Sequence, residues 1–215
     1  DKVLRLSRPC DTEMDLSIDS AFYFAWRGLG TRSSLNNGEF VSILGYKSEA
    51  LVLFSGLGAD ELFAGYLRHE RIFTDLGPNA DDKNTQRAYA ELGKELTKDI
   101  KVIHKRNLGR DDRAMSCWGK ELRYPYLDEE VIKHVLENVP INAKFWYKWI
   151  TSINRKGKET LRIQPIRKWL LREYAEAKDM GWVKDELKRA IQFGAKSAKM
   201  QVGQAKTKGT DVIEG

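Results

Sequence analysis

The stretch Leu51–Tyr66 constrains the fold more than any other part of the chain, and it reads LVLFSGLGADELFAGY. Its first four residues are apolar, too few for a helix, and a Ser-Gly pair follows them directly. This pattern predicts a short buried strand, of the kind found in parallel sheets. Ser55, Gly56 and Gly58 then predict a tight turn in which the backbone can approach a ligand closely.

Asp60 and Glu61 fall in the first turn of the helix expected next, where carboxylates are stabilised by the helix dipole. A strand, a glycine turn and a helix N-terminus together form the edge at which α/β folds bind ligands. The backbone N–H groups suit a phosphate, and the Asp60 carboxylate suits a divalent metal. An ordinary strand-to-helix turn without a ligand is the alternative, and the turn by itself does not separate the two.

Length and composition place the chain among globular proteins. Its 215 residues suit one domain, or one domain with an appendage, and a hydrophobic fraction of 41% is enough for a core. Charged residues make up 32% and carry both signs, which argues against disorder of the whole chain. The net charge of +6 permits nucleic acid or an anionic assembly as a partner, without establishing either.

The two cysteines, Cys10 and Cys117, are too few for a disulfide framework, and we interpret each as a small buried hydrophobe. They predict an intracellular, reducing compartment, either the cytoplasm or the mitochondrion. No apolar stretch reaches the roughly 18 residues that a membrane-spanning helix needs. Because the first residue is not methionine, we expect a chain that is processed, truncated or part of a longer polypeptide, and a removed organellar presequence stays open.

The segments before the glycine turn predict one helix and little other regular structure. Apolar residues all round Ile18–Arg27 predict a deeply buried helix, capped by Asp15 or Ser17. Thr31–Gly38 is rich in Ser and Asn and predicts a polar loop, and Phe40–Leu44 predicts a short helix or strand.

Most of the chain after the glycine turn predicts helix. Apolar spacing and the positions of Pro and Gly favour helices over Asp60–Phe73, Tyr89–Arg106 and Asp111–Arg123, and one capped by Asp128. They also favour a helix interrupted by Pro165 over Lys158–Lys178, and a last helix or helix pair over Trp182–Lys199. The run Lys144–Trp149 predicts an irregular loop that fixes its aromatics in the core, with base stacking as the alternative. Residues 201–215 predict a basic, flexible tail. The expected fold is a helix-rich α/β fold with few parallel strands.

The string SGLGADELFAGY resembles the segment S-G-x-G-S/A-D-E-x-F-x-G-Y of the asparagine synthetase family. Further family segments resemble Arg106–Asp128, Lys158–Arg162 and Lys188–Met200, which read RNLGRDDRAMSCWGKELRYPYLD, KETLR and KRAIQFGAKSAKM. The family pattern at KETLR is K-x-x-L-R. The likeness runs from about Pro9 to Met200, nearly the whole chain. It is strongest to a divergent branch of the family, the asparagine synthetase domain-containing proteins.

The resemblance implies that residues 1–200 are the C-terminal part of an asparagine synthetase domain, which has an adenine-nucleotide α-hydrolase-like fold. In the family this domain uses ATP and Mg²⁺ to adenylate aspartate, and ammonia then displaces AMP. By position, Asp60 would bind the magnesium ion. The residues that would bind pyrophosphate are Ser55, Gly56, Gly58 and Arg189. Those that would support the site structurally are Glu61, Arg110, Arg113, Glu121, Arg123 and Asp128.

The chain also departs from the family pattern. The ATP loop S-G-G-x-D-S is absent from these residues, and so is a Walker-type loop. Leu57 stands where true asparagine synthetases carry a carboxylate, and Ala190 where the family carries a lysine for pyrophosphate. Cys10 is internal and does not match the N-terminal cysteine nucleophile of the glutamine-hydrolysing members. We therefore expect no activity from this chain alone, and we expect an upstream half-domain or another chain to supply the ATP loop.

Two other functions stay open. The changed site, the basic charge and the lysine-rich tail also fit a non-catalytic structural subunit of a larger assembly, for example a mitochondrial one. Nucleic-acid binding is permitted by the charge and the aromatics, but no recognition motif supports it. His69, His104 and His134 lie at no metal-ligand spacing, and we interpret all three as surface or helix-capping residues.

Overall fold

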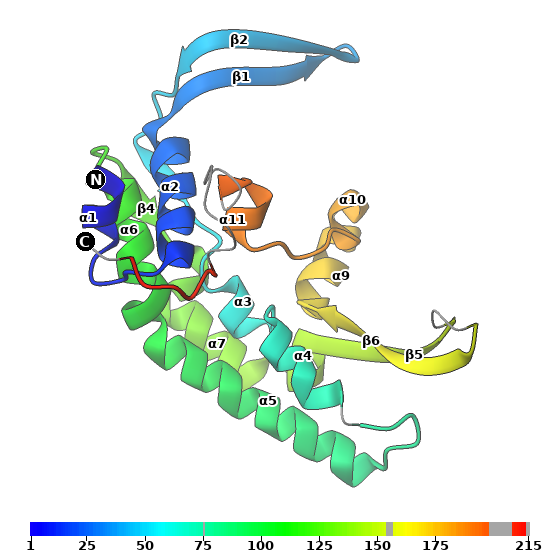
Figure 1. Ribbon diagram of the computed structural model, residues 1–215. Coiled ribbons are helices and arrows are strands. Elements are labelled where there is room, and N and C mark those ends of the chain that lie inside the picture. Colours follow the sequence, from blue (N-terminus) through cyan, green and yellow to red (C-terminus); the bar gives the residue numbers. More distant parts are fainter. Residues whose placement is uncertain (75, 154–156, 198–207, 214–215) are drawn as a thin grey trace. The chain divides into compact units, whose positions relative to one another are not determined.

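The computed structural model describes residues 1–74, 76–153, 157–197 and 208–213. The chain forms two compact units, and Figure 1 labels most of their helices and strands. Unit 1 comprises Asp1–Ser55, His104–Arg123 and Arg189–Gly215, and unit 2 comprises Gly56–Ile103 and Tyr124–Lys188. The chain thus passes from one unit to the other at the start of the glycine turn.

Unit 1 contains helices α1 (Lys2–Ser7) and α2 (Glu13–Arg27), which pack on each other and on α6 (Gly109–Ser116). Thr12 caps α2, because its side chain accepts a hydrogen bond from Asp15 N while the Asp15 carboxylate accepts one from Thr12 N. This reciprocal capping box starts the helix before the predicted Ile18. The predicted caps, Asp15 and Ser17, therefore lie inside the helix.

The prediction that α2 is deeply buried is wrong. Asp19 is its only buried residue, and Phe24 is 58% exposed. The helix packs against α1 and α6, and several of its aromatic side chains contact one another. Phe22 and Trp26, for example, lie edge to face with ring centroids 5.5 Å apart.

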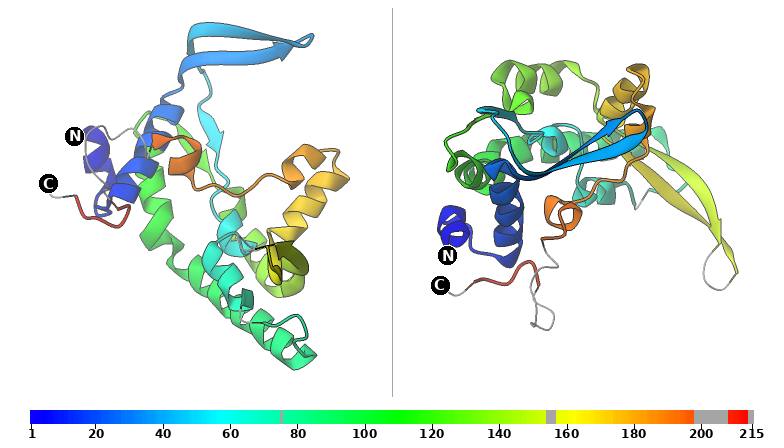
Figure 2. Two further views of the ribbon diagram at one scale, coloured as in Figure 1. Left: turned by 45° about the vertical axis from the view of Figure 1, so that its right-hand side comes forward. Right: turned by 90° about the horizontal axis from the view of Figure 1, so that it is seen from above.

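An antiparallel hairpin of β1 (Leu29–Asn36) and β2 (Glu39–Lys47) replaces the polar loop predicted over Thr31–Gly38 (Figure 2). Asn37 and Gly38 have φ angles of 50° and 85°, which fit the type I′ hairpin turn that an Asn-Gly pair favours. The turn chemistry outweighs the polar composition on which the loop prediction rested.

Unit 1 also contains the strand that precedes the glycine turn. β3 (Val52–Phe54) pairs in parallel with β4 (Glu121–Arg123), so the predicted parallel pairing is confirmed. The predicted burial is wrong, because Phe54 is 72% exposed. The helix predicted to reach Arg123 ends at Ser116, and Gly119, at a φ of 70°, turns the chain into β4.

Unit 2 begins with two short helices and one long one. The helix predicted over Asp60–Phe73 is split into α3 (Ala59–Leu62) and α4 (Leu67–Thr74). It breaks at Ala64, whose φ of 55° is incompatible with a right-handed helix. α5 (Asp82–Ile103) confirms the predicted amphipathic helix, and a π-helical turn, His104–Leu108, follows it in unit 1.

Asp128 caps α7 (Glu129–Asn138), as predicted. Its Oδ1 accepts hydrogen bonds from Glu130 N at 3.0 Å and from Val131 N at 3.3 Å. A 3₁₀ turn, Pro125–Leu127, precedes this cap, and the four-residue helix α8 (Ile141–Lys144) follows α7. The cap satisfies two N–H groups that would otherwise lack partners at the start of the helix.

A second antiparallel hairpin, of β5 (Phe145–Ile153) and β6 (Glu159–Arg167), replaces the irregular loop and the start of the helix predicted there (Figure 2). Phe145 is fully buried, so part of the predicted anchoring by aromatics is confirmed. Pro165 lies in β6, which is an edge strand because its sheet has only the two strands β5 and β6. A proline is tolerated in an edge strand, whereas the interior of a helix would exclude it. The predicted helix is reduced to α9 (Trp169–Ala177).

The described part of the C-terminal region is mostly irregular. The helix or helix pair predicted over Trp182–Lys199 appears as two four-residue helices, α10 (Gly181–Lys184) and α11 (Ile191–Gly194), with irregular chain between them. The last two residues of the predicted range lie outside the described ranges. Residues 201–207 and 214–215 of the predicted tail also lie outside them. The intervening 208–213 runs antiparallel to 11–14, with Ile213 N donating to Asp11 O at 2.8 Å.

Two apolar clusters form the core of unit 2. One contains Ala64, Phe73, Ala88, Leu92, Leu96 and Phe145, and the other Leu62, Phe63 and Val135. Phe73 stacks on Phe145 with ring centroids 4.5 Å apart, which joins α4 to the start of β5. These clusters hold the helices that carry the candidate site. Among the described residues, no helix has the length and apolar character that crossing a membrane requires.

Candidate functional site

The glycine turn follows the end of the parallel strand pair. Ser55 N donates to Arg123 O at 2.9 Å, which continues the β3–β4 ladder by one residue. Gly58 then caps α3 with a φ of 99°, and a Cβ at this position would lie 2.5 Å from Leu127 Cδ2. Only glycine therefore fits at Gly58, for conformational and for steric reasons. The turn leads directly into the helix that carries Asp60.

The Asp60 carboxylate lies between two lysine side chains of unit 2. Its Oδ1 is 2.8 Å from Lys168 Nζ, and its Oδ2 is 3.8 Å from Lys188 Nζ. All three side chains are partly buried, with about a quarter of each exposed. The carboxylate of Asp60 thus faces two positive charges, and the adjacent Glu61 is a second carboxylate on α3.

Gly65 closes the other side of Asp60. A Cβ on Gly65 would lie 1.7 Å from Asp60 Oδ1 and 2.7 Å from Lys168 Cε. Backbone hydrogen bonds fix the same turn, because Gly65 N donates to Asp60 O at 2.8 Å and Lys168 N donates to Phe63 O at 3.0 Å. Asp60 Oδ1 is consequently shut off from solvent.

Tyr66 lies between Glu61, the residue after Asp60, and Lys188. Its hydroxyl donates to Glu61 Oε1 at 2.5 Å, and burial raises the pKa of Tyr66 well above its ordinary value. Its ring lies 5.1 Å from Lys188 Nζ and 4.2 Å from the guanidinium carbon of Arg68. Glu61 is itself buried.

His69 is fully buried, and the prediction that it is a surface or capping residue is wrong. Its Nε2 lies 2.8 Å from Asp99 Oδ2, and its Nδ1 accepts a hydrogen bond from Tyr66 N at 3.4 Å. Because Nδ1 accepts, the proton belongs on Nε2, and burial lowers the pKa of His69. The pair ties α4 to α5. The other two histidines, His104 and His134, are exposed, as predicted.

A second buried charge cluster lies in unit 1. Arg110 forms ion pairs with Asp15, Asp19 and Asp111, and Ser7 Oγ donates to Asp19. Burial raises the pKa of Asp19 to about 7, against the opposing effects of Ser7 and Arg110. This cluster ties α1, α2 and α6 together.

Arg113, Glu121 and Arg123 make different contacts. Arg113 donates to the backbone oxygens of Leu6 and Ser7, so it holds α1 through hydrogen bonds rather than an ion pair. Glu121 and Arg123 lie on β4 and pair with each other at 2.5 Å, both more than half exposed. This ion pair lies within one strand.

The predicted site residues divide between the two units. Gly56, Gly58 and Asp60 belong to unit 2, whereas Ser55 and Arg189 belong to unit 1. The predicted cysteines are free and half-buried rather than fully buried, and burial raises the pKa of each thiol. Within unit 2, the candidate site therefore consists of the two glycines of the turn, Asp60 and the two lysines.

The two lysines were not predicted, although the sequence holds a signal for one of them. The spacing K-x-x-L-R occurs at Lys168–Arg172 as well as at Lys158–Arg162. The structure places Lys158–Arg162 at the exposed start of β6, whereas Lys168 precedes α9 and reaches Asp60. Lys188 immediately precedes Arg189, the residue predicted for pyrophosphate, and it is Lys188 that meets Asp60.

As arranged, Asp60 does not fit a divalent metal. The described residues contain no group of three or more His, Cys, Asp or Glu side chains that could hold one. Magnesium can make do with one or two carboxylates when phosphate oxygens supply further ligands. Here, however, an ammonium group faces each oxygen of the single carboxylate.

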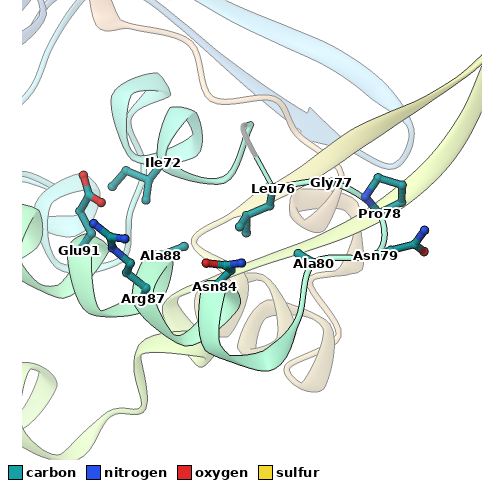
Figure 3. A pocket seen from close by; sticks show the side chains of 10 residues that line it. All are labelled: Ile72, Leu76, Gly77, Pro78, Asn79, Ala80, Asn84, Arg87, Ala88 and Glu91. Carbon is teal, nitrogen blue, oxygen red and sulfur yellow. The ribbon is translucent and has the colours of Figure 1, made fainter.

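A separate pocket of about 660 Å³ lies between the loop after α4 and the first turns of α5 (Figure 3). Ile72, Leu76 and Pro78 give it an apolar part, and Arg87 and Glu91 give it a charged part. None of its ten lining residues is a predicted site residue.

The family described as asparagine synthase matches residues 41–180. Asparagine synthetase domain-containing proteins are similar to nearly all of the chain. The protein from Saccharomyces cerevisiae is 41% identical over 99% of this chain and 33% of its own length. The human protein is 37% identical over 93% of this chain and 27% of its own length, and the mouse protein 35% over 95% and 28%. The chain thus spans about a third, or less, of these relatives.

Proposed function

Because the chain belongs to the asparagine synthase family, we propose that it forms the pyrophosphate-binding part of an ATP-dependent amide-forming domain. The domain would be of the adenine-nucleotide α-hydrolase type, with aspartate as the ancestral substrate. The observation that carries this proposal is the glycine turn, which follows a parallel strand pair and leads into α3 with Asp60 in its first turn. Ligands of α/β folds bind at this edge.

In this proposal, Ser55, Gly56 and Gly58 contact the leaving pyrophosphate through backbone N–H groups and the Ser55 hydroxyl. Such groups stabilise negative charge that develops on a phosphoryl group. Arg189 keeps the role that the family position suggests, as a cation for pyrophosphate, and Asp60 positions Lys168 and Lys188 beside the turn. Within unit 2, the residues that hold Asp60 are Gly65 and Lys168.

We further propose that the chain is inactive by itself. It lacks the S-G-G-x-D-S loop, so nothing in its sequence matches the family's contact to ATP. Leu57 cannot accept a proton, and Ala190 cannot neutralise a phosphoryl oxygen. Removing one charged contact of this kind typically costs about 3–4 kcal/mol of transition-state stabilisation. An upstream segment or another chain would supply the ATP loop, and the greater length of the relatives is in keeping with this.

The test is the formation of AMP from ATP. The purified 215-residue chain is incubated with ATP, Mg²⁺, aspartate and ammonia, and AMP and asparagine are measured together. The proposal predicts no AMP above the level of the same mixture without protein. AMP formation in proportion to the amount of chain, and lost in Asp60→Asn, would contradict the proposed inactivity.

A structural role in a larger assembly is the second candidate, and the β1–β2 hairpin favours it. Phe40 and Leu44 are 80% and 81% exposed, and Leu35 and Ile43 are also exposed. A hairpin of two strands is marginally stable on its own, so exposed apolar residues on it are suited to a protein partner. The compartment of the chain and its protein partners would then be those of that assembly, for example a mitochondrial one.

The hairpin is tested with the double variant Phe40→Asp and Leu44→Asp. Sedimentation of the chain is measured across a concentration series, and Lys47→Asp serves as a control on the same strand. The structural role predicts association that the double variant loses and the control keeps. A wild-type chain that stays monomeric throughout would favour the amide-forming domain instead.

A further inference from the structure

The long helix α5 (Figure 1) carries all its basic residues on one side. At 3.6 residues per turn, they fall within an arc of about 60° and extend over about 27 Å of the helix. This basic stripe lies opposite the face that α5 buries in unit 2, which includes Leu92 and Leu96. Every side chain of the stripe is exposed, and its members are Lys83, Arg87, Lys94, Lys98 and Lys101.

The stability of α5 itself does not explain the basic stripe. Lys94 and Lys98 are four residues apart, and like charges at this spacing destabilise a helix. Within the described ranges, the stripe forms one ion pair, from Lys98 Nζ to Glu95 Oε1 at 3.3 Å, and Lys98 is still 69% exposed. A helix whose charges serve solubility alone intersperses the two signs. The separation of charge on α5 therefore indicates a partner that carries negative charge.

A shallow groove of about 550 Å³ runs beside the basic stripe. Its lining combines small side chains, at Ala90, Gly93 and Thr97, with the last three lysines of the stripe. Small residues three and four positions apart allow a second helix to approach closely. The carboxylates of Glu91 and Glu95 lie on the far side of the lysines from these small residues. An anionic partner in the groove therefore meets the lysines and avoids both carboxylates.

Gly93 is not explained by the folding of the chain. It lies in the middle of α5, where glycine weakens a helix relative to alanine. Among the described residues, a Cβ at Gly93 would meet only Ile141 Cδ1, at an ordinary contact distance of 3.9 Å. Its φ is not in the left-handed region either, so neither packing nor backbone conformation requires glycine. A partner backbone that lies close to α5 would require it, because a side chain at this position would enter the groove.

We propose that α5 docks an acidic helix of a partner protein. The partner helix lies in the groove against Gly93, and its carboxylates pair with the lysines of the basic stripe. A helix suits the groove because it is about 10–12 Å wide and presents side chains at the same three- and four-residue spacing. A nucleic-acid duplex would also extend over Glu91 and Glu95, and the groove has no aromatic lining residue for stacking bases. This surface does not depend on the glycine turn or on the amide-forming function.

The proposal is tested with a fluorescent acidic peptide, whose binding to the full chain is measured by anisotropy at low ionic strength. The peptide has about 20 residues, enough to form a helix, with Glu at three- and four-residue spacing beside a row of Ala. The chain should bind it about tenfold more tightly than the same peptide with Gln in place of Glu, and added salt should weaken the binding. Equal binding of the two peptides, or no binding of the acidic one, would overturn the proposal.

The double variant Lys94→Gln and Lys101→Gln tests whether the basic stripe is the site. Its matched control, Lys133→Gln and Lys148→Gln, removes the same charge from exposed lysines on α7 and β5. The first variant should bind the acidic peptide about tenfold more weakly than the wild type, and the control should match the wild type. An equal loss in both would mean that net charge attracts the peptide, which contradicts a site on α5.

The variant Gly93→Gln distinguishes a helix in the groove from an anion that lies over the lysines alone. Its thermal unfolding temperature should be no lower than that of the wild type, because Gln favours a helix. Binding of the acidic peptide should nevertheless weaken about tenfold, because the new side chain fills the groove. Gly93→Ala, which adds only the Cβ, should show a smaller loss.

Two results would overturn docking in the groove. One is unchanged binding of the acidic peptide in Gly93→Gln. The other is a DNA duplex of the same charge that binds the wild type more tightly than the peptide does, which would assign the stripe to nucleic acid instead.

Discussion

Gly65 is the residue on which the position of Asp60 depends most directly. A methyl group there would overlap Asp60 Oδ1, because the separation would be 1.7 Å. The carboxylate cannot simply turn away, since Lys168 Nζ lies 2.8 Å from the same oxygen and the backbone of Gly65 is bonded to Asp60 O. The glycine is therefore explained by close packing rather than by an unusual φ.

We expect Gly65→Ala to lower the free energy of unfolding by about 1–3 kcal/mol, the usual cost of forcing an extra methyl group into a packed site. Urea denaturation measures the change. Gly77→Ala is the matched control in the same unit, because a Cβ at Gly77 meets nothing within 4 Å. A loss equal in the two variants would show that Gly65 does not have the tight packing described.

Asp19 gives unit 1 a pH dependence. Its pKa is about 7 when folded and about 3.8 ordinarily, so the native state binds the proton more tightly than the unfolded state. The free energy of unfolding is therefore highest, as far as Asp19 is concerned, below about pH 3.8. It falls as the pH rises towards about 7.

The variant Asp19→Asn removes this titration. Between pH 5 and pH 8, the wild type should lose stability relative to Asp19→Asn, as measured by urea denaturation at each pH. Asp11→Asn serves as the control, because Asp11 is more than a third exposed. Parallel curves for the wild type and Asp19→Asn would mean that burial does not shift the pKa of Asp19.

Asp60 could be identified as a candidate site residue from the sequence, but its partners Lys168 and Lys188 could not. Asp60 follows a glycine turn, so its position in a local pattern reveals it. Lys168 and Lys188 are more than a hundred residues away along the chain, and only the fold brings them to Asp60. His69 was misinterpreted for the same reason, since its partner Asp99 lies on another helix.

Among the elements, α7 shows how a local signal fixes a helix. Asp128 was predicted as its cap, and its Oδ1 accepts two hydrogen bonds from backbone N–H groups. We expect Asp128→Ala to lower the free energy of unfolding by about 1 kcal/mol, a typical effect for an N-cap. Glu137→Ala, an exposed carboxylate on the same helix, should change it by much less. A loss as large in Glu137→Ala would point to charge rather than capping.

Both hairpins were missed as elements, for different reasons. The first depends on two residues, Asn37 and Gly38, whose turn preference is stronger than the polar composition around them. In the second, β5 and β6 stabilise each other, and neither strand has a pattern strong enough to predict it alone. The same holds for β4, which was assigned to a helix because its parallel partner β3 lies far away in sequence.

For the whole molecule, the sequence indicated a mixed, helix-rich fold and the family, and the structure added the division into two units. The division could not be predicted, because each unit combines segments that lie far apart along the chain. The glycine turn lies where the chain passes from unit 1 to unit 2. The turn itself follows from a local sequence pattern, but the residues that pack around it are distant in sequence and could not be predicted.

The most direct test of the account measures AMP formation in a complete domain. A chimera joins this chain to the preceding part of an active asparagine synthetase, which carries the S-G-G-x-D-S loop, and is supplied with ATP, Mg²⁺, aspartate and ammonia. We predict AMP formation by the chimera, none by the chain alone, and a rate about 100-fold lower in the Asp60→Asn chimera. A chimera that forms no AMP, or one whose rate is the same with Asp60→Asn, would contradict the account.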